Sequence, residues 1–389
     1  MENKFKRLAI ISDCVHMRNE DGMAVTENHI YCRQIQELSK HFEHTVIVCP
    51  FVAFTNESVT SVYTLPFIDF IELPNAGGNT ISDKWKLIRT IPTWISAFKK
   101  AKRVSDIIFL RMPNNLSIPG FFYFKFKRAK TFAVYTGTWD NYTNEPLTYR
   151  FQKWLLKKFF EGPVWIYVNK KPADHHLLKG YSPSYSEAEW MEETEQVAKR
   201  IAEYEHTEIE RPVFITVGAL VPNKNQQYIL ETCKRLRDNG FSFYWYIVGD
   251  GYLKENYATF IEENVLQHHV CLAGKKTYTE LRDLYRKANF LVQATYVEGF
   301  GKAPIEGMFH GVIPLLSKTA MAEEMTGDGN RGFIFDTSDE HSLEQVIKRA
   351  MTARDRFNDI ITNGREYVKS QTIQSWSACI INNINSYFK

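Results

Sequence analysis

Short apolar runs that end at or near a glycine recur along the second half of the chain, with helix-compatible stretches between them. A buried strand, a glycine turn and a helix in this order are typical of a parallel α/β sheet, whose loops at the carboxyl ends of the strands bind ligands. The second half therefore predicts one doubly wound sheet. Its six expected strands cover 213–217, 244–248, 270–272, 290–293, 313–316 and 332–335.

The first half alternates in the same way, with expected strands at 8–11, 45–49, 107–110, 131–135 and 165–168. This pattern suits a second, mostly parallel sheet. The 389 residues also exceed a single hydrophobic core, which stops growing at about 250 to 300 residues. We expect a first domain over 1–185, a linker over 186–211 with a helix-favouring part at 187–205, a second domain over 212–365 and a closing helix over 366–389.

The stretch from Glu298 to Glu306, EGFGKAPIE, follows the run at 290–293 and leads into a helix. Gly299 and Gly301 allow close backbone approach and unusual φ angles, and the N–H groups of a helix's first turn bind anions. Glu298 is placed to accept hydrogen bonds from sugar hydroxyls, and Glu306 from the hydroxyls of a ribose. The motif indicates a nucleotide diphosphate sugar. A tight loop with two solvated glutamates is the alternative.

The order of the motifs resembles the second domain of the retaining glycosyltransferases with the GT-B fold, family four. The motifs are VGALVPNKN from Val217, IVGDG from Ile247, EGFGKAPIEG from Glu298, HGVIPLL from His310 and GNRGFIF from Gly329. The resemblance is close over 212–350 and only general in the first domain. It implies an α/β chain of two Rossmann-like doubly wound domains facing a central cleft, with the C-terminal helix crossing back to the first domain.

The implied activity is transfer of a hexose-type sugar from a nucleotide diphosphate sugar, here a UDP-sugar, to a lipid-linked glycan or surface polysaccharide. Neither a metal nor another cofactor is expected. The implied catalytic residues are Glu298 and Lys224. The implied donor-binding residues are Gly22, in the loop from Asp13 to Val25, and Gly218, Lys224, Gly249, Asp250, Gly251, Lys276, Glu298, Gly299, Phe300, Gly301, Lys302, Ala303 and Glu306.

At the end of the expected strand 131–135, Tyr135, Thr136 and Asp140 are expected on the acceptor side. The family often has a histidine near this position and this chain has none, and packing is the alternative role for these residues.

Ala219 stands where the family usually has an arginine. Two cations normally offset the charge of the departing diphosphate. Either Lys302 supplies the second positive charge or catalysis is weak. The alternative role for Lys302 is that of a solvated lysine in a loop. The missing arginine and histidine leave a non-catalytic nucleotide-sugar-binding protein open as an alternative. A further alternative is another GT-B activity such as a sugar-nucleotide epimerase or a phosphorylase.

Residues 99–158 contain 13 basic and 3 acidic residues, interleaved with aromatics. Within 149–160, Phe151, Trp154, Leu155 and Phe159 recur at helical spacing while Lys153 and Lys157 turn elsewhere. This favours a helix on an anionic membrane surface, where lipid-linked acceptors are presented. A core-facing helix is the alternative, and nucleic-acid binding is not expected because no recognised module accompanies the stretch.

The chain contains no run of about 18 apolar residues, and its N-terminus does not read as a signal peptide. Its six cysteines are scattered without a CxxC pair. We expect a cytoplasmic enzyme with reduced thiols, bound peripherally to the inner face of the membrane.

Overall fold

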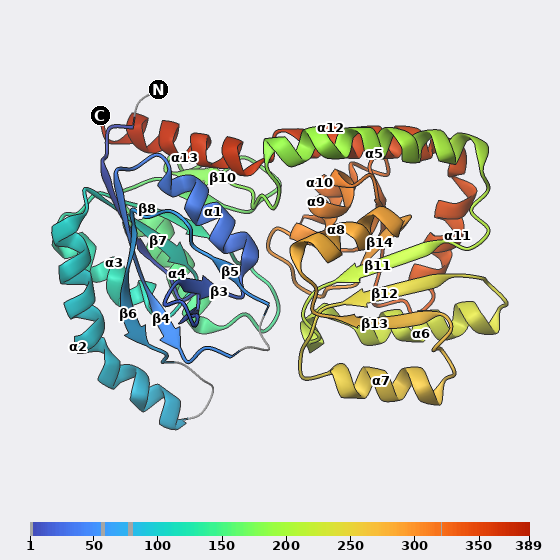
Figure 1. Cartoon of the computed structure of the whole chain (residues 1–389), viewed down its shortest axis with the longest axis horizontal. Coiled ribbons are helices and arrows are strands. Elements are labelled where there is room, and N and C mark those ends of the chain that lie inside the picture. Colours follow the sequence, from blue (N-terminus) through green and yellow to red (C-terminus); the bar gives the residue numbers. More distant parts are fainter. Residues whose placement is uncertain (1–2, 56–58, 77–80, 320) are drawn as a thin grey trace. The chain divides into compact units, whose positions relative to one another are not determined.

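The computed structural model describes residues 3–55, 59–76, 81–319 and 321–389. The chain forms two compact units, shown in Figure 1. The first unit comprises Met1–Ser184 and Ile373–Lys389, and the second comprises Tyr185–Thr372. Both are α/β units built on mostly parallel sheets, which confirms the predicted fold class.

The sheet of the first unit is parallel apart from the pairs that β3 makes with β2 and β5. Its main path runs β10 (Leu177–Lys179), β9 (Val164–Ile166), β8 (Thr131–Tyr135), β7 (Ile107–Met112), β1 (Arg7–Ile11), β4 (His44–Val52), β2 (His16–Arg18), β3 (Ala24–Thr26) and β5 (Ser61–Val62). A further strand, β6 (Ile68–Pro74), pairs in parallel with β4. The helices are α1 (His29–Ser39), α2 (Ile81–Val104), α3 (Ser117–Phe126), α4 (Leu147–Phe159) and α13 (Ile373–Tyr387).

The expected open loop from Asp13 to Val25 contains the hairpin of β2 and β3 instead. Gly22, with φ of 76°, lies in its turn and donates its N–H to the carbonyl of Asn19 at 2.9 Å. The N–H of this predicted donor-binding residue is therefore used inside the hairpin. Arg18 fixes the hairpin to β6 through an ion pair with Glu72 at 2.8 Å.

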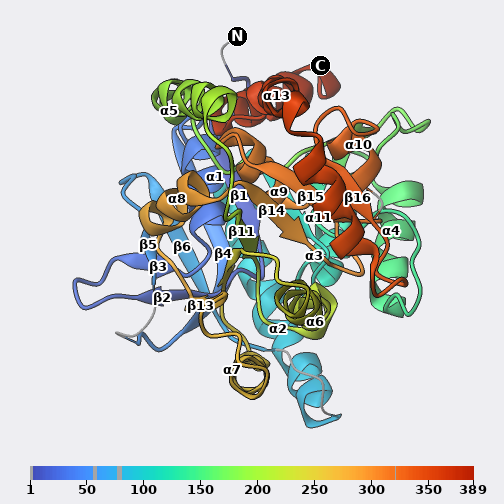
Figure 2. The same cartoon turned by 90° about the vertical axis from the view of Figure 1, so that its right-hand side faces the viewer.

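The sheet of the second unit consists of six parallel strands, at the positions that the sequence predicted. Their order is β13 (Val270–Gly274), β12 (Tyr244–Val248), β11 (Val213–Val217), β14 (Phe290–Gln293), β15 (Ile313–Ser317) and β16 (Phe333–Phe335). The strand order reverses between β11 and β14, and open α/β sheets bind ligands at such a reversal. Figure 2 shows β14, β15 and β16 in succession, with α11 beside β16.

The helices of the second unit connect these strands. They are α5 (Glu187–His206), η1 (Pro222–Lys224), α6 (Gln226–Asp238), α7 (Lys254–Glu263), α8 (Tyr278–Lys287), α9 (Lys302–Phe309), α10 (Ala322–Thr326), α11 (Ser342–Thr352), η2 (Arg354–Arg356) and α12 (Phe357–Lys369).

Residues 186–211, expected as a linker, are mostly helix α5, an integral part of the second unit. Ser186 and Glu189 form a capping box that starts the helix. The helix then lies beside α12 (Figure 1) and buries Glu193 and Arg200. These buried charges tie α5 to the unit and explain why the segment does not behave as a spacer.

The single closing helix expected over 366–389 is divided between two helices. Helix α12 ends at Lys369 in the second unit, and α13 begins at Ile373 in the first, where it packs beside α1. The helix is interrupted because the N–H of Gln371 bonds to the carbonyl of Val368 at 2.9 Å, in a tighter turn.

Candidate functional site

The loops that follow β11 and β14 meet at the strand reversal of the second unit. The first contains η1 with Lys224, and the second contains Glu298. Asn223 joins them, because its Nδ2 donates to the carbonyl of Val297 at 2.9 Å and its Oδ1 accepts the N–H of Val297 at 3.2 Å. The structure thus brings together the two predicted catalytic residues, 74 positions apart in sequence.

Glu298 is held by two side chains. Its Oε2 accepts a hydrogen bond and ion pair from Nζ of Lys224 and a second hydrogen bond from Nε2 of Gln293 at 2.9 Å. The Lys224 and Glu298 side chains are 24% and 21% exposed, so both are reachable from solvent. Sequence reasoning missed Gln293, although a polar residue at the end of a buried strand is a signal for a ligand site.

Helix α9 begins directly after the Glu298 loop. Gly301 takes its N-cap position with φ of 75°, a left-handed conformation that favours glycine. The N–H groups of a first helical turn have no partner within the helix and carry partial positive charge. Phe300 and Ala303 are buried, so their side chains anchor the turn, while Gly299 and Lys302 are half-buried.

Glu306 lies in α9 and is 8% exposed. Its Oε2 accepts a hydrogen bond from the hydroxyl of Tyr285, in α8, at 2.9 Å. Burial, and secondarily the adjacent carboxylate, raises the pKa of Tyr285 well above its usual range, so the phenol remains protonated and donates. Sequence reasoning missed Tyr285 because an aromatic residue on an amphipathic helix reads as core.

Three of the expected donor-binding glycines have a packing role. A Cβ at Gly249, where φ is 142°, would lie 2.0 Å from the carbonyl oxygen of Gly218, and one at Gly251 would lie 2.4 Å from that of Leu220. Gly218 and Gly249 also use their N–H groups in backbone bonds to Val248 and Gly274. These glycines therefore let the β11 and β12 loops touch, and the N–H groups of Gly218 and Gly249, two of the predicted donor-binding residues, are used in backbone bonds.

Asp250 and Lys276 are engaged locally. Oδ1 of Asp250 accepts the N–H of Gly251 at 2.9 Å and lies 3.8 Å from Nζ of Lys254. Lys276 lies 3.7 Å from Glu280 at the start of α8. Their charges are at the loop end of the sheet, but these contacts stabilise the loops themselves.

The three expected acceptor-side residues, in the first unit, differ in exposure. Tyr135 is fully buried against Trp139, with ring centroids 5.3 Å apart, so an acceptor contact by its side chain is ruled out in this structure. Thr136 donates its hydroxyl to the carbonyl of Met112 at 3.1 Å, whereas Asp140 is exposed. The loop after Tyr135 is held by the buried Lys153.

Three of the four apolar residues predicted for the membrane-facing side of the helix, Phe151, Trp154 and Phe159, are exposed, and the fourth is not. Leu155 is buried in the core, and so is Lys153, which pairs with the buried Glu145 at 2.6 Å. Exposed apolar side chains of α3 and α4 make up what we term the α3–α4 aromatic face. They are Phe122, Phe126, Leu147, Phe151, Trp154 and Phe159.

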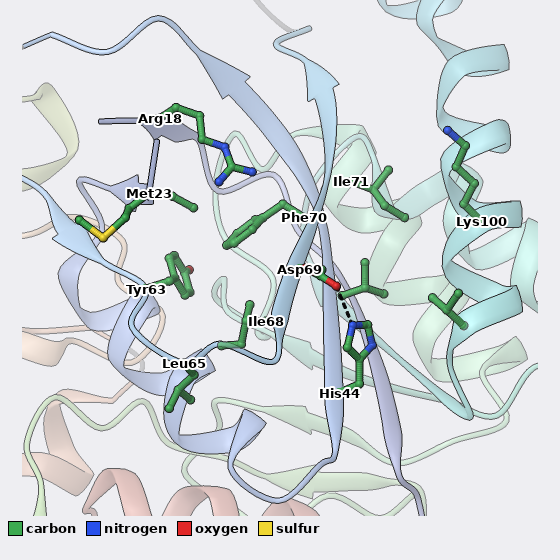
Figure 3. A pocket seen from close by; sticks show the side chains of 13 residues that line it. Arg18, Met23, His44, Tyr63, Leu65, Ile68, Asp69, Phe70, Ile71 and Lys100 are labelled. Atoms are coloured by element: carbon green, nitrogen blue, oxygen red, sulfur yellow. Dashed lines mark hydrogen bonds and ion pairs between the residues drawn. The ribbon is translucent and has the colours of Figure 1, made fainter. Parts of the chain in front are cut away.

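A hollow of about 540 Å³ opens in the first unit beside β4 and β6 (Figure 3). His44 and Asp69 point toward one another there and form a 2.8 Å hydrogen bond. His44 and Ile68 are the first residues of their strands. This part of the hollow is therefore at the amino ends of the strands, opposite to the end where such sheets bind ligands, and we assign it no part in the site.

Two Rossmann-like units and a returning C-terminal helix define the GT-B fold. The chain is similar to the crystal structure of the Anabaena protein Alr3699/HepE in complex with UDP and glucose, with a TM-score of 0.67, 13% identity, and coverage of 97% of this chain and 99% of the other. At this identity the likeness establishes the fold.

Residues 199–367, within the second unit, match the family model "Glycosyl transferases group 1". Among curated relatives, an uncharacterized glycosyltransferase, MJ1178, of Methanocaldococcus jannaschii is 28% identical over 42% of this chain and 44% of its own length. The O-antigen chain mannosyltransferase RfbU of Salmonella typhimurium is 28% identical over 42% of this chain and 46% of its own. The chain thus matches less than half the length of each.

Proposed function

We propose that this chain is a retaining glycosyltransferase, which transfers a hexose from a UDP-sugar to a lipid-linked glycan or surface polysaccharide without a metal. The observation that supports it most is the meeting of Lys224 and Glu298 at the strand reversal of the second unit, beside the first turn of α9. Glu306 follows in the same helix. A cation and a helix start suit a diphosphate, and the carboxylates suit hydroxyls.

Each residue has a defined part in this proposal. Oε1 of Glu298, which neither Lys224 nor Gln293 contacts in the described bonds, accepts a hydroxyl of the donor sugar. Glu306 accepts the ribose hydroxyls. The acceptor oxygen forms a bond to the anomeric carbon while the bond to the diphosphate breaks, and a phosphate oxygen takes the acceptor's proton. Lys224 offsets the charge that develops on the diphosphate.

The donor base is tested by the melting temperature of the purified protein with UDP, GDP, ADP and their sugars. A ligand that binds the folded state at 100 times its Kd should raise the melting temperature by about 5 °C or more. We expect the largest shift with uridine compounds, unchanged by EDTA, since HepE was crystallised with UDP. A larger shift with GDP would replace the donor in this proposal, and the absence of any shift would contradict it.

Turnover separates the proposed enzyme from its alternatives. Purified protein should release UDP from a radiolabelled UDP-sugar when a membrane extract supplies the acceptor. Binding without turnover with any extract would identify a nucleotide-sugar-binding protein, and conversion of the donor without an acceptor would identify an epimerase.

We also propose that the α3–α4 aromatic face rests on an anionic membrane. Phe126 is 80% exposed and Trp154 49% exposed, and the exposed cations Lys157 and Lys158 lie on the same helix as Trp154. Lys125 joins the two helices, because its Nζ donates to the carbonyl of Phe159 at 2.9 Å. Exposed aromatic rings bordered by lysines are typical of interfacial membrane binding. In the part of the chain that the structure describes, no helix is both long and apolar enough to cross a membrane.

Sedimentation with liposomes tests this surface. The protein should pellet with anionic vesicles at low salt and be released at about 1 M salt, where the Debye length falls to about 3 Å. A double variant, Phe126→Ser with Trp154→Ser, should pellet several-fold less, whereas Met191→Ser, at a 73% exposed position on α5, should not differ from wild type. Equal binding to neutral vesicles would remove the electrostatic part of the proposal.

A further inference from the structure

Helix α5 directs two buried charged side chains at the elements that carry the candidate site. Arg200 is 9% exposed and donates to the carbonyl oxygens of Tyr285 at 3.2 Å and Ala288 at 2.6 Å. Those carbonyls lie at the C-terminal end of α8, where helices leave carbonyl groups without partners. A cation at that end is favourable for the helix dipole. Arg200 therefore fixes the part of α8 that contains Tyr285.

Glu193 of α5 is linked to the same tyrosine through His310. Its carboxylate is fully buried, lies 2.8 Å from Nδ1 of His310, and pairs with Arg286 at 2.7 Å. His310 follows the end of α9 and is 3% exposed. Its ring stacks on the ring of Tyr285, with centroids 5.2 Å apart and planes 17° apart.

These contacts form one continuous buried column. It runs from Glu193 through His310 to the ring of Tyr285, and the hydroxyl of Tyr285 donates to Glu306. A buried ring that is stacked on one face and hydrogen-bonded at its hydroxyl has little rotational freedom. The hydrogen bond from Tyr285 therefore holds the Glu306 carboxylate in one orientation.

We infer that Tyr285 is a positioning residue, which orients the Glu306 carboxylate toward the ribose of the bound nucleotide, and that Glu193 and His310 fix the tyrosine ring. This inference rests on the proposed function. It adds that α5, outside every predicted motif, determines how well the site holds the nucleotide.

The test is Tyr285→Phe, which keeps the ring and its stacking and removes the hydroxyl. The probe is whichever of UDP, GDP and ADP binds the wild-type protein most tightly, and its 2′,3′-dideoxy form. We expect the variant to bind the probe about 10-fold more weakly, the loss of roughly one hydrogen bond to a charged group. The dideoxy form should bind wild type and variant equally, because it has no ribose hydroxyls for Glu306 to accept.

Two comparisons separate positioning from a general loss of structure. Tyr204→Phe removes another hydroxyl of the second unit, which accepts from Asn289 at 2.9 Å, and should leave nucleotide binding unchanged. Adding Tyr285→Phe to Glu306→Gln should weaken binding no further, since coupled residues are not additive. In turnover, KM for the donor should rise about 10-fold with kcat little changed.

The outcomes are distinct. Equal Kd values for the probe in wild type and Tyr285→Phe, or an equal loss with the dideoxy form, would overturn the inference and leave the proposed function standing. Wild-type protein that binds none of the nucleotides would overturn both.

Discussion

Replacing Glu298 with glutamine should lower kcat by about 100-fold or more while UDP still binds with a Kd near that of wild type. The amide has the size of the carboxylate but lacks its charge, and hydrogen bonds to an ionised acceptor are about twice as strong as neutral ones. Only the sugar is proposed to contact Glu298, so the effect should appear when a sugar is transferred. Steady-state kinetics with a UDP-sugar and calorimetry with UDP measure the two quantities.

The control is an ion pair of the same unit that shares no partner with Glu298. Glu344 lies 2.7 Å from Lys348 in α11 and also accepts from Asn239. Glu344→Gln should retain wild-type kcat. If Glu298→Gln turned over at more than half the wild-type rate, the proposed role of this carboxylate would be wrong.

Replacing Lys224 with methionine should lower both kcat and the affinity for UDP. We expect kcat to fall by about 100-fold, because the lysine is the cation proposed to offset the leaving diphosphate. The affinity for UDP should fall by about 10-fold, since a point charge beside the phosphates is lost. Removing Lys224 also frees Glu298 from its ion pair and leaves an uncompensated carboxylate near the phosphates, which adds to the loss. Lys348→Met is the matched control.

Ala219, at the position where an arginine was expected, allows the source of the second positive charge to be tested. Ala219 is exposed, so the loop has room for the arginine that the family resemblance implies at this position. If Lys302 supplies the second charge, Lys302→Met should lower kcat by about 10-fold and Ala219→Arg should restore part of it. A Lys302→Met variant with full activity would make this lysine a loop residue and leave Lys224 as the proposed cation for the diphosphate.

The contact between Lys224 and Glu298 has a consequence for donor binding. In this structure Lys224 and Glu298 satisfy each other's charge, and the two side chains are only about a quarter exposed. In the proposed function, a donor places its phosphates beside Lys224 and its sugar beside Glu298. The ion pair between the two side chains is then either retained or broken. Gln293 is bonded to the same carboxylate oxygen, so we expect it to hold Glu298 in place when a donor binds.

Several parts of the fold were predictable because they depend on local pattern. Short apolar runs such as 213–217 and 290–293 indicate buried strands when turn residues flank them, and glycine turns after them mark the loop end of a parallel sheet. The helix after Gly301 was predictable for the same reason. The hairpin around Gly22 was missed, since strands of three residues leave too few positions for a periodic signal.

Other errors arose because exposure was inferred from spacing alone. Helical periodicity groups residues on a face but does not say which face meets the core, so Leu155 was assigned to the surface and the buried Lys153 to solvent. The pairing of Lys153 with Glu145 makes that burial tolerable, and no sequence spacing indicates it. Tyr135 was placed beside a ligand because it ends a strand, yet its ring fills the core.

The sequence by itself determined the α/β class and the second sheet, because strand periodicity and glycine turns are properties of consecutive residues. The glycine-turn motif also predicted Glu298 and Glu306 as site residues, and the family resemblance predicted Lys224. Only the tertiary structure decided which distant side chains meet: Lys224 with Glu298, and Glu193, His310 and Tyr285 with Glu306. Such contacts depend on strand order and helix packing, which join residues more than a hundred positions apart in this unit and leave no local pattern in the chain.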